Sequence, residues 1–262
     1  MNLIAPILLG WVSGLFVNYA SDVLPRARRF SQPVCVNCGS EFSWLDYLTF
    51  RACRSCGLTR SLRTWIVQIA MTASFAYVWL NTPRALGLPL SLIVLTYFAV
   101  ITVIDLEHRL ILFPTSVFGA ALGLIVGTYI YFHGKQYSFL TSVGSSLLGG
   151  VIGFGVMYLV YQLGAVVARY RARKMQAAGQ ADDEEEAFGG GDVYLAGVIG
   201  LMLGSEYILY GLTYGVLLGG LVSVMLIVTT IIQQKYSNRS LMVFIPYAPY
   251  LIAGAMYMLY FG

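Results

Sequence analysis

The stretch from Phe188 to Leu195, FGGGDVYL, is the part of the sequence around which the rest is organised. It places Asp192 directly after three glycines, where a polar and acidic segment gives way to a long apolar one. Glycine has no Cβ, so the backbone can turn sharply there and another chain can approach it closely. A second acid, Asp105, stands where a different apolar run ends. Two carboxylates at membrane boundaries predict a site shared between two helices.

The composition places most of the chain in a lipid bilayer. Of the 262 residues, 58% are hydrophobic and only 11% are charged, and the mean hydropathy is +0.74. A water-soluble domain of this size does not need that much apolar surface. The formal net charge is +4, but the basic residues follow the connections between apolar runs and form no single patch. We therefore expect a membrane protein that contacts lipid and does not bind nucleic acid.

Eight apolar runs of spanning or near-spanning length predict an all-α polytopic membrane protein with about eight transmembrane helices. Polar breaks separate the runs, and the break between the sixth and the seventh, at residues 204–206, is weakly marked. The expected helices cover residues 2–20, 64–80, 88–104, 114–132, 139–168, 193–204, 206–232 and 244–261.

The distribution of basic residues predicts how these helices are oriented. If the N-terminus lies outside, the inner connections hold 14 of the 16 lysines and arginines, and Arg84 and Lys135 remain outside. By the positive-inside rule, both termini then face the exterior, and Asp105 and Asp192 lie at the cytoplasmic face. The first apolar run has no basic residue before it and no small-residue cleavage site, so we expect it to remain as a helix. The inner connections are residues 21–63, 105–112, 169–174 and 233–241.

The first inner connection, residues 21–63, is the one long enough to fold by itself. We expect it to form a small zinc-binding cytoplasmic domain between a first transmembrane helix at 1–20 and a membrane-embedded domain at 64–262. All four cysteines lie in it, as two C-x-x-C pairs with 14 residues between the pairs. This spacing suits tetrahedral thiolate coordination, because each pair can direct two sulfurs at one ion. The candidate metal ligands are Cys35, Cys38, Cys53 and Cys56.

Two disulfides or four free thiols are the alternatives for these cysteines. A reducing cytoplasm argues against disulfides, and the spacing favours a zinc site. Four thiolates leave no open position for a substrate, so we expect the zinc to be structural.

A charged cytoplasmic loop is expected at residues 169–191, with basic residues at its start and the acidic run 182–186 near its end. Blocks of like charge rarely fold, so we interpret the loop as flexible, with its basic end anchored at lipid headgroups. The acidic run could hold a metal ion, but consecutive acids repel one another and usually remain solvated.

Asp105 and Asp192 are the candidate functional residues, because an ionisable group in a membrane segment is costly and therefore often functional. The alternative is a helix cap, which suits Asp192 but not Asp105, since an acid at a helix C-terminus opposes the dipole. If the two helices pack together, repulsion between the carboxylates leaves one ionised and the other protonated. An aspartic protease requires such a pair, and a proton-coupled transporter would use the same carboxylates.

Several short motifs follow one another along the chain in a characteristic order. They are LPR after the first apolar run (24–26), the double C-x-x-C, IDL around Asp105 followed by Pro114, GGGDVYL around Asp192, and IPYAPY at 245–250. In this order the sequence resembles the type IV prepilin peptidases, which are membrane aspartic proteases of the G-x-G-D kind. The IDL and GGGD segments resemble the motifs of the first and second catalytic aspartates, and the double C-x-x-C resembles the family's zinc-binding cytoplasmic domain.

The resemblance implies a membrane aspartic endopeptidase with Asp105 and Asp192 as its catalytic pair. Members remove the short basic leader from type IV prepilins or pilin-like precursors after a glycine, and Gly189 and Gly191 would let the substrate backbone approach in extended form. Many members also N-methylate the new N-terminal residue with S-adenosylmethionine. The resemblance further implies a multi-pass protein of the prokaryotic inner membrane.

Two other classes of function stay open at this point. One is a proton-coupled transporter that uses the same two aspartates, and the other is a pilus-assembly scaffold that needs neither. A transporter has no evident need of a four-cysteine cytoplasmic domain, which favours the peptidase. The sequence also differs from the family at Gln68, where a glutamate is common, and at Tyr194, where a lysine is common.

Overall fold

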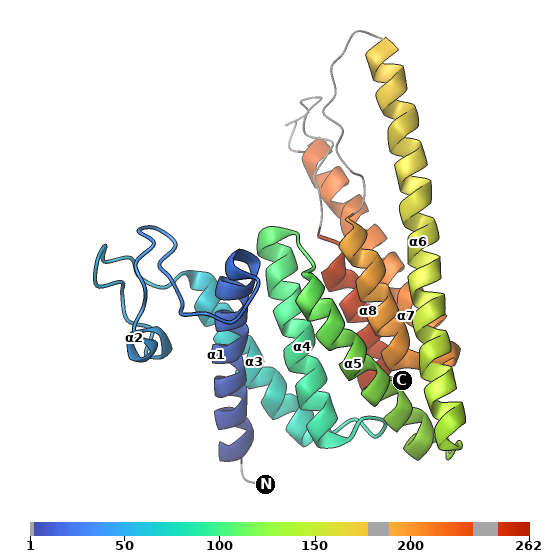
Figure 1. Cartoon of the computed structure of the whole chain (residues 1–262), viewed down its shortest axis with the longest axis horizontal. Helices are drawn as coiled ribbons and strands as arrows, with labels where there is room; N and C mark the ends of the chain where they lie inside the picture. Colours follow the sequence, from blue (N-terminus) through green and yellow to red (C-terminus); the bar gives the residue numbers. More distant parts are fainter. Residues whose placement is uncertain (1–2, 178–188, 233–245) are drawn as a thin grey trace. The chain divides into compact units, whose positions relative to one another are not determined.

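The computed structural model describes residues 3–177, 189–232 and 246–262. Most of these residues are helical, and the extended pairing among them is an isolated antiparallel bridge between Val34 and Glu41. The all-α prediction is therefore confirmed. The acidic run 182–186, the connection 233–241 and Ile245 lie outside the described residues. The elements are α1 (Ile4–Ala27), α2 (Trp44–Leu48), α3 (Leu62–Leu80), α4 (Gly87–His108), α5 (Phe113–Tyr129), the π-helix η1 (Ile130–Gly134), α6 (Phe139–Ala177), α7 (Gly190–Ile232) and α8 (Ala248–Phe261) (Figure 1).

The chain forms two compact units, Met1–Pro114 and Thr115–Gly262. In the first unit, α1, α3 and α4 pack against one another, and the segment 28–61, which we call the cysteine module, joins α1 to α3 (Figure 1). In the second unit, α7 packs against both α6 and α8. Asp105 belongs to the first unit and Asp192 to the second.

Within the described residues, five helical segments are long and apolar enough to cross a membrane, namely α1, α4, α5 with η1, α6 and α7. The two expected helices, 193–204 and 206–232, meet within α7 at Gly204, where the backbone is non-helical and the helix is kinked. Long apolar side chains point away from the packed interior along these helices; Leu8, Leu159 and Leu221 are each at least 60% exposed. A lipid-facing surface accounts for this exposure, because the hydrocarbon core of a bilayer solvates apolar side chains.

Polar side chains join α1 to α3 in the apolar interior of the first unit. Gln68 is fully buried, and its Nε2 donates a hydrogen bond to the Trp11 carbonyl oxygen at 2.5 Å. A Cβ on Gly14 would lie 2.9 Å from Gln68 Oε1, so the glycine gives the amide room. Asn18 Nδ2 donates to the Thr64 carbonyl oxygen at 3.2 Å. Such side-chain amides link helices that have no hydrophobic driving force to associate in lipid.

Glycines let α6 and α7 approach backbone to backbone in the second unit. A Cβ on Gly200 would lie within 3.0 Å of the Gly149 carbonyl oxygen, and a Cβ on Gly153 equally close to the Ala196 carbonyl oxygen. Any larger residue would therefore push the helices apart. Gly155, by contrast, faces open space.

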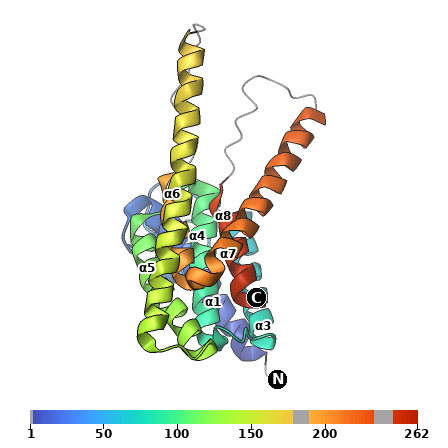
Figure 2. The same cartoon turned by 90° about the vertical axis from the view of Figure 1, so that its right-hand side faces the viewer.

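Helix α7 is broken at Gly204, where φ is 70° and ψ is 180°, and its second half leaves at an angle (Figure 2). The side chain of Tyr131, in η1, is fully buried against this break. Its hydroxyl donates to the Leu203 carbonyl oxygen at 3.1 Å and accepts from the Glu206 amide at 3.4 Å. Tyr131 thus satisfies backbone groups that the interrupted helix leaves without their usual partners.

Candidate functional site

The four cysteines lie in two turns with the same backbone hydrogen bond. The Gly39 amide donates to the Cys35 carbonyl oxygen at 2.9 Å, and the Gly57 amide donates to the Cys53 carbonyl oxygen at 2.8 Å. Both glycines have a φ of 70°, a region that glycine enters without steric cost. Each turn therefore presents its two cysteines to the same side.

The structure brings the four sulfurs together, as the spacing predicts. All four lie within 4.8 Å of one another, and the Cys35–Cys56 and Cys38–Cys53 pairs are each 3.6 Å apart. These distances are too long for a disulfide, and all four thiols are free. A tetrahedral ion with metal–sulfur bonds of about 2.3 Å sets its sulfurs about 3.8 Å apart. The cluster therefore fits a metal ion such as zinc.

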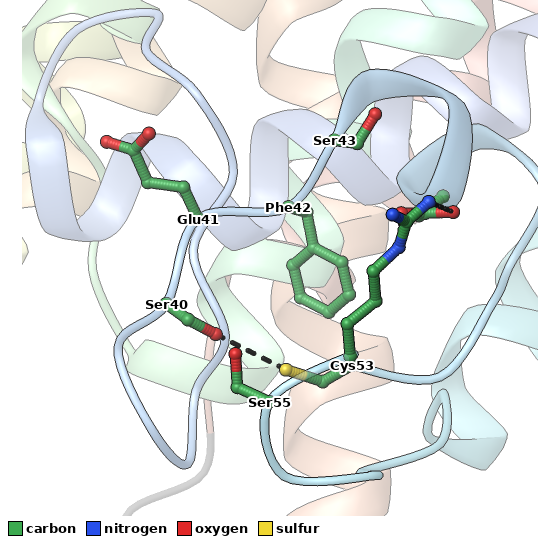
Figure 3. Close-up of a pocket in the computed structure, with 8 residues that line it drawn as sticks. Ser40, Glu41, Phe42, Ser43, Cys53 and Ser55 are labelled. Atoms are coloured by element: carbon green, nitrogen blue, oxygen red, sulfur yellow. Dashed lines mark hydrogen bonds and ion pairs between the residues drawn. The ribbon is translucent and has the colours of Figure 1, made fainter.

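Ser40 lowers the pKa of two of the thiols. Its hydroxyl lies 3.0 Å from Cys38 Sγ and 3.3 Å from Cys53 Sγ, and Figure 3 shows the second contact. Its hydrogen bonds lower the pKa of Cys38 and lower the pKa of Cys53 to about 6. For Cys56, the Leu58 backbone amide lowers the pKa, but burial and the other thiols raise it to about 11. Ser40 thus favours the thiolate, which is the metal-binding form, at two of the four ligands.

A pocket of about 220 Å³ opens beside the cluster, with Cys53 and Phe42 in its lining (Figure 3). Its buried acid, Asp46, is already held by Arg54, whose Nε lies 2.6 Å from Oδ2 and whose Nη2 donates to Oδ1 at 3.0 Å. The hydrogen bond to Asp46 raises the pKa of Arg54. This contact fixes the second cysteine turn to α2. We therefore assign Asp46 and Arg54 a structural role in the module.

A group of charged residues lies where α1, α3 and α4 meet the module. Arg63 forms ion pairs with Asp22 and, at 3.0 Å, with Glu107, and Arg60 lies 3.9 Å from Asp22. Sequence reasoning used the two arginines only to orient the helices. The pairing has no local signal, because the partners of Arg63 are 41 and 44 residues away in the chain.

Asp105 lies in the last turn of α4, because this helix continues to His108, beyond the expected end at residue 104. Its side chain is buried. Its carbonyl oxygen accepts a hydrogen bond at 2.9 Å from the amide of Arg109, which caps the helix in the left-handed conformation with a φ of 53°. The helix end thus fixes the backbone that carries a buried acid, and a buried acid in a membrane segment is a functional candidate.

Asp192 lies in the first turn of α7 and is buried. There the partial positive charge of the helix N-terminus favours a carboxylate. A Cβ on Gly189 or Gly190 would meet no atom within 4 Å, so neighbouring side chains do not require glycine at these two positions. Without side chains, these residues leave the backbone before Asp192 open to another chain. Gly191 is partly exposed beside them.

Tyr247, at the start of α8, lies within the electrostatic influence of the Asp192 carboxylate. Burial and the Asp192 carboxylate both raise the pKa of Tyr247. A Cβ on Gly219 of α7 would lie 2.9 Å from the Tyr247 ring, so the ring packs directly on that helix. From the sequence, the IPYAPY motif is associated with the aspartates only through its order in the chain, whereas in the structure the charge of Asp192 acts on its Tyr247.

These features define a class of protein, a multi-spanning membrane protein with a four-cysteine metal module near its start and a buried aspartate at a helix end in each unit. Residues 92–224 match the model of the type IV leader peptidase family. The matched segment covers about half of the chain and contains both Asp105 and Asp192. The chain therefore belongs to the type IV leader peptidase family.

Two curated relatives carry the name prepilin leader peptidase/N-methyltransferase. The protein from Myxococcus xanthus (strain DK1622) is 24% identical over 232 residues, which cover 85% of this chain and 62% of the relative. The protein from Vibrio cholerae serotype O1 (strain ATCC 39315 / El Tor Inaba N16961) is 25% identical over 193 residues, which cover 69% of this chain and 65% of the relative. This chain thus spans less than two thirds of the length of either. No solved structure shows a significant match, and nothing in these comparisons supports a transporter.

Proposed function

We propose that this protein is a membrane aspartic endopeptidase that removes the leader peptide from type IV prepilins or pilin-like precursors. One observation carries the proposal: the segment that matches the family contains two buried acids at helix ends, Asp105 and Asp192. The names of both curated relatives support the same activity.

In this proposal Asp105 and Asp192 act as the catalytic pair. One carboxylate takes a proton from water, whose oxygen attacks the scissile carbonyl carbon, while the protonated partner donates a hydrogen bond to the carbonyl oxygen. Collapse of the tetrahedral intermediate breaks the C–N bond, and a proton passes to the departing amine. Two neighbouring carboxylates divide these roles because like charges at short range cannot both ionise near neutral pH.

Gly189 and Gly191 are proposed to admit the substrate backbone. The open space around Gly189 supports this role, because no packing within the unit demands glycine there. Gly191→Val should therefore lower cleavage while the helices remain intact. Full cleavage by that variant would contradict the role.

The location that we propose is the prokaryotic inner membrane, with both termini outside and both aspartates at the cytoplasmic face. The distribution of basic residues supports this orientation, since Arg84 and Lys135 alone fall in the outer connections. The cysteine module would then lie in a reducing compartment, where thiolates remain available for zinc.

Zinc is proposed to be structural, held by Cys35, Cys38, Cys53 and Cys56, because four thiolates would leave it no open position for a substrate. N-methylation of the new N-terminal residue with S-adenosylmethionine is proposed as the second activity. It rests on the names of the two relatives.

The test is cleavage of a pilin precursor by the purified full chain and by its Asp105→Asn and Asp192→Asn variants, with products weighed by mass spectrometry. Asparagine keeps the size of the side chain but cannot exchange the proton. We expect wild type to cut after the leader glycine and both variants to be silent, with unchanged helix content. Added S-adenosylmethionine should increase the mature fragment by the mass of one methylene group. Cleavage that persists without either aspartate would refute the proposal.

A further inference from the structure

We infer that the cysteine module positions Asp105 through a chain of four side chains, Tyr47, Asp22, Arg63 and Glu107. This positioning chain begins in the module and ends on α4 two residues after Asp105. The inference rests on the proposed function, because it describes how the proposed catalytic acid is held in place.

The module end of the chain is built into the same small core as the metal ligands. Tyr47 is buried in one cluster with Cys35, Cys53 and Phe42. Its hydroxyl donates a hydrogen bond to Asp22 Oδ2 at 2.5 Å. Burial and the negative charge of Asp22 raise the pKa of Tyr47, so the phenol keeps the proton that it donates. Folding of the cysteine turns therefore sets the position of a hydrogen bond to α1.

Arg60 fixes the ring of Tyr47. Its guanidinium carbon lies 4.0 Å from the centroid of the Tyr47 ring and 4.6 Å from that of Phe42. It also donates to the Tyr47 carbonyl oxygen at 3.4 Å and lies 3.9 Å from Asp22. A cation that contacts two aromatic rings and a carboxylate leaves the phenol little freedom to turn.

Arg63 links the two halves of the positioning chain. It lies in the first turn of α3, and its planar guanidinium binds Asp22 of α1 through one nitrogen and Glu107 of α4 through the other, the latter at 3.0 Å. The Arg63 and Asp22 side chains are each 20% exposed, so their contact is partly shielded from water, whereas Glu107 is 36% exposed. The rigid fork of arginine holds two acids in fixed directions, whereas a lysine would not.

Glu107, at the α4 end of the positioning chain, holds the helical turn that carries Asp105. The last turn of a helix frays unless something fixes it. The Arg109 amide caps the backbone at Asp105, and Glu107 ties the side of the same turn to Arg63. Because a displacement of about 1 Å can slow catalysis about 100-fold, this second tie is important for an acid that must meet a substrate.

The experiment uses the full-length protein. Two nearly isosteric changes, Tyr47→Phe and Glu107→Gln, alter opposite ends of the positioning chain and are tested alone and together. Glu41→Gln is the matched control, since Glu41 is an exposed acid of the same module that forms no ion pair with any described residue. The measurements are kcat and KM for cleavage of a pilin precursor, the pH profile of kcat, helix content and bound zinc.

We expect each variant to lower kcat about tenfold or more with KM unchanged, and to displace the acidic limb of the pH profile. Helix content and bound zinc should equal those of wild type, and Glu41→Gln should behave as wild type. The double variant should be no slower than the slower single variant, because both changes interrupt the same chain. Arg63→Lys should also lower kcat, since it keeps the charge but not the fork.

Wild-type kcat and pH profile in both single variants would overturn the inference. Effects that multiply in the double variant would also overturn it, because they would show two independent roles. Loss of helix content or zinc in step with kcat would assign the residues to stability alone. Failure of the wild-type protein to cleave the precursor would instead overturn the proposed function, and this inference with it.

Discussion

Gly204→Ala tests whether the break in α7 is required by the fold. The residue has a φ of 70° and a ψ of 180°, a combination that is essentially restricted to glycine. A Cβ there would also lie within 3.0 Å of the ring of Tyr131, which is fully buried and cannot move aside into solvent. Both the backbone and the packing therefore oppose any side chain at this position.

Both effects contribute to the expected magnitude. A non-glycine residue in this backbone region costs about 1–3 kcal/mol, and overpacking a filled interior costs about another 1–3 kcal/mol. We therefore expect Gly204→Ala to lower the free energy of unfolding by about 2–6 kcal/mol. Gly220 lies on the same helix, but a Cβ there meets nothing within 4 Å. Gly220→Ala should thus leave stability unchanged or raise it by up to about 1 kcal/mol, through helix propensity alone.

The assay is unfolding of the purified protein in mixed micelles of increasing denaturing detergent, followed by far-ultraviolet circular dichroism. Tryptophan fluorescence provides an internal reference, because all four tryptophans lie within residues 1–114. Gly204→Ala should shift the loss of helix to lower detergent, relative to Gly220→Ala. If both variants unfold at the same detergent concentration, the assignment of Gly204 as an obligatory break is wrong.

Three further predictions concern Tyr131 and the cysteine module. Tyr131→Phe should lower stability by about 1–3 kcal/mol in the same assay, because the Leu203 carbonyl loses its donor; wild-type stability would show that the hydroxyl is dispensable. Cys35→Ser should lower bound zinc below one ion per chain, measured by atomic emission, and destabilise the module before it affects cleavage. Loss of cleavage in a variant that stays folded and zinc-loaded would contradict a structural role for the zinc site. Ser40→Ala should raise the pKa of Cys53 from about 6 towards the ordinary thiol value, so that zinc displaces more protons at pH 7 and its affinity falls more steeply below pH 8. A pH electrode in weakly buffered solution measures this release, and an unchanged proton count would contradict the role of Ser40.

The sequence predicts most helices because the hydropathy of a membrane helix is a property of the segment itself. It also predicts a break near residues 204–206, because a glycine followed by two polar residues interrupts the apolar run, and the structure places a break at Gly204. The structure supplies partners for that break: Tyr131 reaches its backbone, and Glu206 pairs with Lys135. These partners come from elsewhere in the chain, so hydropathy along the sequence cannot reveal them.

The same distinction applies to the site. The cysteine cluster could be predicted because both C-x-x-C turns are local, and the structure confirms that their sulfurs meet. The contacts of Arg63 could not be predicted, because they depend on how α1, α3 and α4 pack. The pairing of Asp105 with Asp192 remains a prediction, and its test is the cleavage assay.

The two cysteine turns also determine how a metal ion would enter and leave the module. Each turn has one buried and one exposed cysteine: Cys35 and Cys53 are shielded, whereas Cys38 and Cys56 are open to solvent. A chelator or a metal-donating thiol would therefore reach a bound ion from the side of Cys38 and Cys56. If ligands were replaced one at a time along this route, Cys35 and Cys53 would be the last to dissociate. The module should thus load and release its ion through a single face, at a rate set by the two exposed thiols.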